Sequence, residues 1–228
     1  VRDIPFSETI ISKKIWNTVE YCRILKAVGV VDGDGGSGKT RTMEEWRKDK
    51  TDVIAVTVTP AFASPKSFLK VLARALKTNK QGSIDDIFSD ILDKLEGTDR
   101  TIVIDEAQHL TCKTLELVRS INDMQGTAII LIGNELIYNN MQGRQQAEFA
   151  QLFSRIGMKI HLLTDYFTER DVSIIFKDVE QGAAKYLLDI CKSKYGLRGA
   201  IHVYINAKNN EDISVKGIVA MSRMMGIG

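Results

Sequence analysis

One stretch of the sequence restricts the possible folds more than any other: residues 33–40, which read Gly-Asp-Gly-Gly-Ser-Gly-Lys-Thr. It matches the phosphate-binding pattern G-x-x-x-x-G-K-[ST] at every fixed position. The apolar run 27–31 before it predicts a strand, and residues 39–48 after it predict a helix. A strand, a glycine-rich loop and a helix in this order predict an α/β nucleotide-binding fold.

The residue types of this phosphate loop, residues 33–40, indicate how a nucleotide would bind. Glycines let the backbone form a tight cradle whose N–H groups face phosphate oxygens, and the positive end of the next helix favours the anion. Lys39 is expected to reach the β- and γ-phosphates, and the Thr40 hydroxyl is expected to bind Mg²⁺. The predicted ligands are ATP and Mg²⁺, and the predicted nucleotide-binding residues are Gly33, Asp34, Gly35, Gly36, Ser37, Gly38, Lys39, Thr40 and Asp105.

A pair of carboxylates, Asp105 and Glu106, ends a strongly apolar strand pattern, residues 101–104. Such a strand is buried on both faces, and its carboxyl end opens on the crevice where ligands of α/β folds bind. Asp105 is predicted to hold Mg²⁺, directly or through water, and Glu106 to polarise the attacking water. With the phosphate loop, this pair predicts an enzyme that hydrolyses ATP.

Composition excludes several other classes. The 228 residues suffice for one domain, or for one domain with a small appendage. The net charge of +2 excludes a nucleic-acid binder that relies on bulk charge, although a local basic groove stays possible. The cysteines lie far apart and are expected to be free thiols: Cys22, Cys112 and Cys191. No membrane-spanning run and no signal peptide are evident, so we expect a cytoplasmic protein without a membrane partner.

The strand patterns stop part-way along the chain. They lie at residues 27–31, 52–59, 101–106, 127–133 and 158–163, with helical patterns between them, including two short ones within residues 136–156. After residue 165 the sequence shows only helical patterns, at residues 168–176, 181–194, 197–208 and 214–225. The expected domains are an α/β nucleotide-binding domain, residues 1–165, and a small all-helical domain, residues 166–228.

The phosphate loop, the strand end Ile-Asp-Glu-Ala-Gln-His at 104–109 and Leu-Ile-Gly-Asn at 131–134, in this order, resemble the AAA+ ATPases. The resemblance covers nearly the whole chain, but only these motifs are specific. It implies a five-stranded parallel sheet sandwiched by helices, followed by a helical lid. It also implies that Asn134 is a polar sensor on the strand between the phosphate-loop strand and the Asp-Glu strand. Asn134 would orient the attacking water together with Glu106.

The same resemblance assigns roles to two arginines. Arg155, just before the fifth strand, matches the arginine finger, which completes the active site of a neighbouring subunit. Arg198 matches the second sensor, which reaches the γ-phosphate from the lid. Alternatives stay open for both, because Arg144 could replace Arg155 as the finger and Arg198 could be a surface residue that caps its helix.

Among AAA+ proteins, the compact domain and brief lid resemble the ATPases of transposition, the group of the phage Mu B, TnsC and IstB proteins. This resemblance implies an ATPase that forms a homo-oligomer, a helical filament, on double-stranded DNA and that recruits and stimulates a transposase. The Mu B protein carries an N-terminal helix-turn-helix domain, and nothing before Ser7 could form one. We therefore expect either a fragment or a protein that relies on its ATPase core for DNA.

Two other functions stay open. The first is an AAA+ loader or switch that acts on a protein partner, such as a helicase loader or secretion ATPase. The second, a small-molecule kinase, is disfavoured because the carboxylates, the sensors and the finger fit a water-activating oligomeric ATPase better.

If the chain binds DNA, the candidate contacts are basic residues near loop or helix ends: Lys66, Lys94, Arg100 and Lys113.

Overall fold

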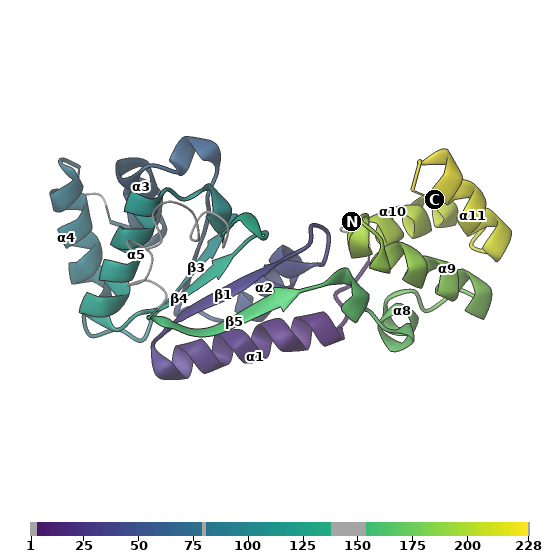
Figure 1. Ribbon diagram of the computed structural model, residues 1–228, viewed down its shortest axis with the longest axis horizontal. Helices are drawn as coiled ribbons and strands as arrows, with labels where there is room; N and C mark the ends of the chain where they lie inside the picture. The colour runs from purple at the N-terminus through teal and green to yellow at the C-terminus, as the bar shows by residue number, and fades with distance from the viewer. Residues whose placement is uncertain (1–3, 79–80, 138–153, 228) are drawn as a thin grey trace. The chain divides into compact units, whose positions relative to one another are not determined.

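The computed structural model describes residues 4–78, 81–137 and 154–227 (Figure 1). It contains one five-stranded sheet with the order β2-β3-β4-β1-β5. The strands are β1 (Val28–Gly33), β2 (Val53–Thr57), β3 (Thr101–Asp105), β4 (Ala128–Ile132) and β5 (Ile156–Leu162). The predicted five-stranded α/β fold is confirmed, and β4 lies between β1 and β3, as the resemblance implies.

Helices account for most of the other described residues. They are α1 (Ile10–Leu25), α2 (Lys39–Arg47), α3 (Pro65–Ala75), α4 (Ile84–Leu95), α5 (Cys112–Gln125), α8 (Glu169–Ile175), α9 (Gln181–Lys192), α10 (Gly196–Asn209) and α11 (Val215–Met224). Short 3₁₀ turns, which the sequence patterns did not reveal, span Pro60–Phe62, Ala107–His109 and Thr164–Tyr166. The two short helices expected within residues 136–156 fall mostly on residues outside the described ranges, and so does Arg144.

Local signals explain where helix α5 begins and ends. The Thr114 N–H in the first turn donates to the Thr111 carbonyl at 3.0 Å and to the Thr111 hydroxyl at 3.3 Å, so Thr111 caps the helix. At the other end Gly126 adopts φ +59°, and its N–H donates to the Asn122 carbonyl. This left-handed conformation favours glycine, so the chain leaves the helix at that residue and enters β4.

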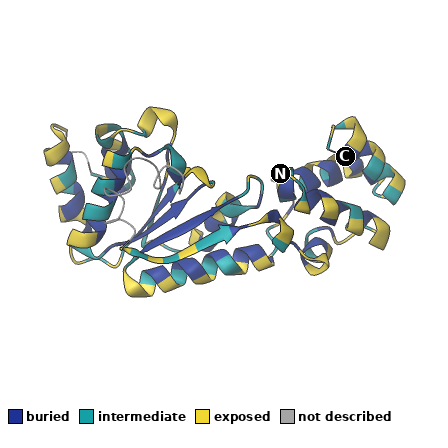
Figure 2. Ribbon diagram, viewed as in Figure 1, coloured by how far each residue is buried: buried dark blue, intermediate teal, exposed yellow. Residues whose placement is uncertain are grey.

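The strands pair in parallel register, and their side chains alternate between two buried faces. Ile102 of β3 lies beside Ile54 of β2 and Ile129 of β4. One face packs against α3, α4 and α5 in an apolar cluster, and Figure 2 shows β1, β3 and β4 as the most deeply buried strands. On the other face a Cβ at Gly29 would lie 2.9 Å from the Cys22 Sγ, so α1 approaches β1 closely there.

The chain forms two compact units. The sheet unit comprises Trp16–Asp32 and Trp46–His161 and contains most of the sheet with α3, α4 and α5. The lid unit comprises Val1–Ile15, Gly33–Glu45 and Leu162–Gly228. The phosphate loop therefore groups with the C-terminal helices. The expected domain boundary at residue 165 stays a prediction.

The N-terminal segment is tied to helix α8 inside the lid unit. The Ile10 N–H donates to the Asp171 carboxylate at 2.9 Å, and the Ser7 hydroxyl donates to the Ile174 carbonyl at 3.2 Å. Asp171 also accepts from the Thr168 N–H and hydroxyl, so one buried carboxylate caps α8 and the start of α1. Its hydrogen bonds offset the cost of burying it.

Candidate nucleotide site

The phosphate loop has the backbone that its glycines predict. Gly33, Gly36 and Gly38 have φ values of +141°, +77° and +91°, which side chains rarely allow. A Cβ on Gly33 would lie 2.1 Å from the Leu162 carbonyl oxygen, so this position has no room for any side chain. The loop therefore requires glycine for its shape and, at its first residue, for a close backbone approach.

Lys39 begins helix α2 and folds back over the loop. Its Nζ donates to the carbonyl oxygens of Gly33 and Asp34 at 2.9 and 2.7 Å, and it lies 3.3 Å from the Ser37 hydroxyl. The Ser37 hydroxyl donates in turn to the Asp34 carbonyl at 3.0 Å. The ammonium group thus lies directly over the cradle where the pattern places phosphate groups.

The Asp34 side chain links the loop to the C-terminal helices. Its carboxylate accepts from the N–H and the hydroxyl of Thr164 at 3.2 and 3.3 Å. The Thr164 hydroxyl also lies 3.2 Å from the carbonyl of Lys192 at the end of α9. The loop is therefore anchored through a variable position of the pattern, a role that the motif did not reveal.

Arg198 lies against the phosphate loop. Its N–H donates to the Gly36 carbonyl at 3.2 Å, and its Cβ would lie 3.4 Å from a Cβ on Gly36. Gly196, at φ +59°, approaches the same loop so closely that a Cβ there would lie 3.0 Å from the Gly36 carbonyl. Residue 198 is exposed, and the start of α10 holds it beside the loop, where a second sensor would have to lie.

In the sheet unit, β3 ends as predicted at Asp105 and Glu106. Glu106 has φ +57° and ψ +37°, the left-handed region that a residue with a side chain seldom occupies. Its N–H donates to the Asp105 carboxylate at 2.9 Å, which stabilises this tight turn. Such backbone strain is often found at functional sites, because the surrounding structure must hold it there.

Gln108, which the sequence analysis did not single out, connects Glu106 to the end of β4. Its amide nitrogen donates to the Glu106 carboxylate, and its amide oxygen accepts from the Asn134 N–H at 3.4 Å. A Cβ on Gly133 would lie 2.1 Å from that oxygen, so glycine makes room for the contact. The only sequence signal was its place within the strand-end motif, two residues after Glu106.

Asn134 follows β4 beside the end of β3. Its side-chain oxygen accepts from the Leu136 N–H at 2.9 Å and so fixes the turn after the strand. The structure therefore brings Asp105, Glu106, Gln108 and Asn134 together at the carboxyl end of the sheet.

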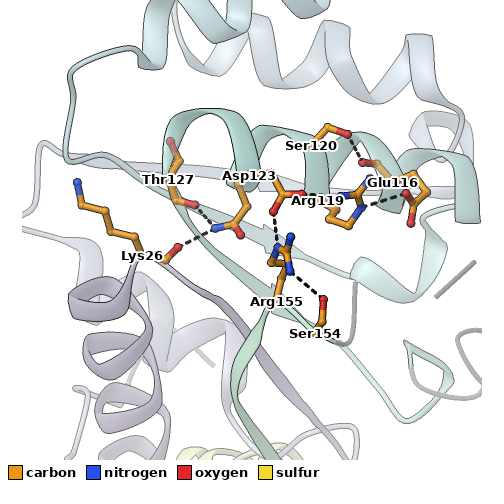
Figure 3. Close-up of polar contacts among 9 residues, drawn as sticks. Lys26, Glu116, Arg119, Ser120, Asp123, Thr127, Ser154 and Arg155 are labelled. Carbon is orange, nitrogen blue, oxygen red and sulfur yellow. Dashed lines mark hydrogen bonds and ion pairs between the residues drawn. The ribbon is translucent and has the colours of Figure 1, made fainter. Parts of the chain in front are cut away.

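Arg155 lies at the other end of the sheet, immediately before β5. Its carbonyl accepts from the Val28 N–H at 2.9 Å, so the starts of β5 and β1 lie side by side. Its side chain pairs with the Asp123 carboxylate of α5 and donates to the Ser154 hydroxyl at 2.9 Å (Figure 3). Arg155 is thus separated from Glu106 by the length of the strands.

The predicted magnesium ligands have suitable chemistry. Thr40 offers a hydroxyl from the first turn of α2, and Asp105 offers a carboxylate at the end of β3. Mg²⁺ prefers oxygen ligands and commonly keeps several waters and substrate phosphates, so two protein ligands fit it. Within the described residues, no group of three or more His, Cys, Asp or Glu side chains forms a separate metal site.

All three cysteines are free thiols, as expected; Cys22 and Cys191 are buried, and Cys112 is partly buried. Burial raises the pKa of Cys22 to about 11. Burial and, secondarily, the Asp171 carboxylate raise the pKa of Cys191 to about 12. Both thiols therefore stay protonated near neutral pH and are poor nucleophiles.

In the part of the chain that the structure describes, no helix has the length and apolar character needed to cross a bilayer.

A family model matches the central part of the chain. Residues 24–141, which include the phosphate loop, the Asp105–Glu106 pair and Asn134, match the family described as AAA domain. The chain belongs to this AAA family. The match ends before Arg155 and Arg198.

Curated relatives of the chain include two target DNA activators and one DNA transposition protein. It is 36% identical over 156 residues to the ATP-dependent target DNA activator B of Escherichia phage Mu and equally to that of Escherichia phage D108. The match covers 68% of this chain and 50% of each relative, so the chain spans about half the length of these two proteins. It is 28% identical over 207 residues to the Mu-like prophage FluMu DNA transposition protein B of Haemophilus influenzae, covering 87% of this chain and 71% of the relative.

Among solved structures, the ORC2 protein of Aeropyrum pernix, in ADPNP-ADP complexes, has the same fold. The TM-score is 0.59 at 18% identity, and the match covers 92% of this chain and 66% of ORC2.

Proposed function

We propose that the chain is the ATP-hydrolysing core of an ATP-dependent activator of target DNA in transposition. The observation that carries the proposal is the phosphate loop, with three glycines at positive φ and Lys39 over its carbonyl oxygens. It occurs in a chain that is 36% identical to two proteins named as ATP-dependent target DNA activators.

In this proposal the loop binds the phosphates of ATP. Charged phosphate oxygens are stronger partners for an ammonium group than carbonyl oxygens are, so Lys39 is expected to exchange its contacts with Gly33 and Asp34 for the β- and γ-phosphates. Arg198, on the helix that begins beside Gly36, would reach the γ-phosphate from the lid unit. Lys39→Ala should therefore abolish ATP binding, measured by titration with a fluorescent ATP analogue.

Glu106 would act as the general base toward the attacking water, and Asn134 would help to orient that water. The contact from Gln108 holds the Glu106 carboxylate in place before the reaction. Thr40 and Asp105 would hold Mg²⁺, which supplies charge stabilisation at the phosphate oxygens. Arg155 would complete the site of a neighbouring copy, because its own Glu106 lies at the other end of the sheet.

The proposed assembly is a homo-oligomer, a helical filament on double-stranded DNA that recruits and stimulates a transposase. A single chain with a net charge of +2 neutralises few phosphates, whereas a filament places the same basic residues along many of them. Lys66, Lys94, Arg100 and Lys113 are the candidate contacts.

Fluorescence anisotropy on short and long duplexes, with ATP, ADP or no nucleotide, tests the DNA part of the proposal. Binding should require ATP, rise with duplex length and protein concentration, and fall steeply with salt. Lys39→Ala protein, which cannot bind ATP, is the control and should not bind. Equal affinity in the three nucleotide conditions, or no binding to long duplex with ATP, would favour a loader or switch that acts on a protein partner.

A further inference from the structure

Arg155 is held by its side chain in a specific way. Its Nε donates to one carboxylate oxygen of Asp123, and one terminal nitrogen, Nη1, donates to the Ser154 hydroxyl at 2.9 Å. Figure 3 shows the guanidinium group between these two partners. The hydrogen bond from Nε fixes the orientation of the guanidinium group, and Nη2 takes no part in these two contacts.

Asp123 is itself fixed on α5. Its second carboxylate oxygen accepts from Arg119 Nη1, and Arg119 Nε donates to Glu116 at 3.1 Å (Figure 3). The side chains of Asp123 and Arg119 are 25% and 19% exposed, against 45% for Arg155. The more buried side chains of Arg119 and Asp123 therefore support the more exposed side chain of Arg155.

Hydrogen bonds tie the backbone near Asp123 and the backbone at Arg155 to the same region, the start of β1. The buried Asn122 amide donates to the carbonyls of Lys26 and Thr127, at 2.8 Å each, which fixes the end of α5 beside β1 and β4. The Arg155 carbonyl accepts from Val28, two residues after Lys26. Both partners of the ion pair are therefore positioned by rigid elements, as a preorganised site requires.

We propose that Asp123 is a positioning residue that orients Arg155 for ATP hydrolysis in a neighbouring copy of the chain. This inference rests on the proposed function, in which Arg155 is the arginine finger. An exposed ion pair contributes little to stability, so orienting a functional arginine is a better reason for this arrangement than holding the fold. Exposed apolar side chains, as expected of a face that a second copy covers, follow Asp123 in the sequence at Met124 and precede Lys26, the partner of Asn122, at Ile24 and Leu25.

The experiment measures ATP turnover with long duplex DNA for Asp123→Ala, Asp123→Asn and Glu116→Ala. Asp123→Ala should lower kcat roughly tenfold to a hundredfold with KM for ATP unchanged, because the finger loses its direction. Asp123→Asn keeps an oxygen that accepts from Arg155 Nε and should recover most of the rate. Glu116→Ala is the matched control, because Glu116 contacts Arg119 but not Arg155, and its rate should stay within about twofold of wild type.

Mixing subunits locates the defect. Lys39→Ala protein lacks a working nucleotide site but keeps Asp123 and Arg155, so it should restore turnover to Asp123→Ala protein. Failure of this rescue would place the defect in the variant's own site and overturn the inference. Normal turnover by Asp123→Ala, while Arg155→Ala is slow, would overturn it as well and leave the proposed function intact.

Normal turnover by Arg155→Ala would instead refute the arginine-finger assignment. ATP binding by Asp123→Ala confirms that the variant is folded, and alanine suits this helical position. If that variant binds no ATP, Asp123→Ser repeats the test with a hydroxyl too short to reach Arg155.

Discussion

The two ends of the sheet hold their functional side chains by different means. At the carboxyl end Glu106 depends on a strained backbone, φ +57°, and on a neutral amide from Gln108. At the amino end Arg155 lies in the turn before β5 without a positive φ and is directed by the Asp123 carboxylate. A general base must keep its proton affinity, and a neutral amide orients it without adding a charge, whereas a cation can be directed by an anion. The contrast is what we expect if, as proposed, the first end performs chemistry within its own subunit and the second serves a neighbour.

Replacing Arg155 should have the largest effect on turnover. Arg155→Ala should bind ATP normally and lose about a thousandfold in hydrolysis, because the finger stabilises charge in the transition state. The rate of ATP hydrolysis is measured as phosphate release with malachite green. Added Lys39→Ala protein should restore part of the rate, and no rescue at any mixing ratio would contradict action on a neighbour.

Replacing Glu106 should have the next largest effect. Glu106→Gln should keep ATP affinity and lose about a hundredfold or more in turnover, because the water is no longer activated. The same mixing assay separates the two ends, because Lys39→Ala protein cannot rescue a chain that lacks its own base. Normal hydrolysis by Glu106→Gln would show that another group activates the water.

Removing Gln108 should have an intermediate effect. Gln108→Ala should lower kcat about tenfold with ATP affinity retained, since Glu106 keeps its chemistry but loses its orientation. Gln125→Ala, at the amino end of the sheet, is the control and should leave turnover unchanged. Equal rates for the two variants would show that the strained backbone alone orients Glu106.

Removing Asn122 should affect the fold rather than the chemistry. Asn122→Ala deletes two hydrogen bonds of a buried amide and leaves two carbonyls without this donor, which should cost about 2 kcal/mol of unfolding free energy. Urea denaturation followed by circular dichroism measures the change, and Asn17→Ala on the exposed side of α1 is the control. A loss of ATP turnover at temperatures where the Asn122→Ala variant is fully folded would show that Asn122 also contributes to function.

Much of the fold was predictable because its signals are local. The phosphate-loop pattern fixed the junction of β1 and α2, and Thr111 and Gly126 marked the two ends of α5. The resemblance to AAA+ proteins placed the Asn134 strand between the phosphate-loop strand and the Asp-Glu strand, and β4 lies there.

The contacts that hold the functional side chains were not predictable from these signals. Asp123 and Arg155 are far apart in the sequence and meet only because α5 and β5 both start or end beside β1. Asp34 and Thr164 meet for a similar reason within the lid unit. A motif specifies the residues that touch a ligand, whereas their supports depend on tertiary packing, which any residue of suitable chemistry can supply.

The grouping of the phosphate loop with the C-terminal helices has a practical consequence for measuring nucleotide occupancy. Three backbone amides, those of Asp34, Thr164 and Arg198, all donate hydrogen bonds within this one connected set. Because the loop and the start of α10 share these bonds, tightening the loop around phosphate should slow solvent exchange of the amides on both. Deuterium uptake by a peptide from the start of α10 would then report the filling of a site distant in the sequence, without any label on the nucleotide.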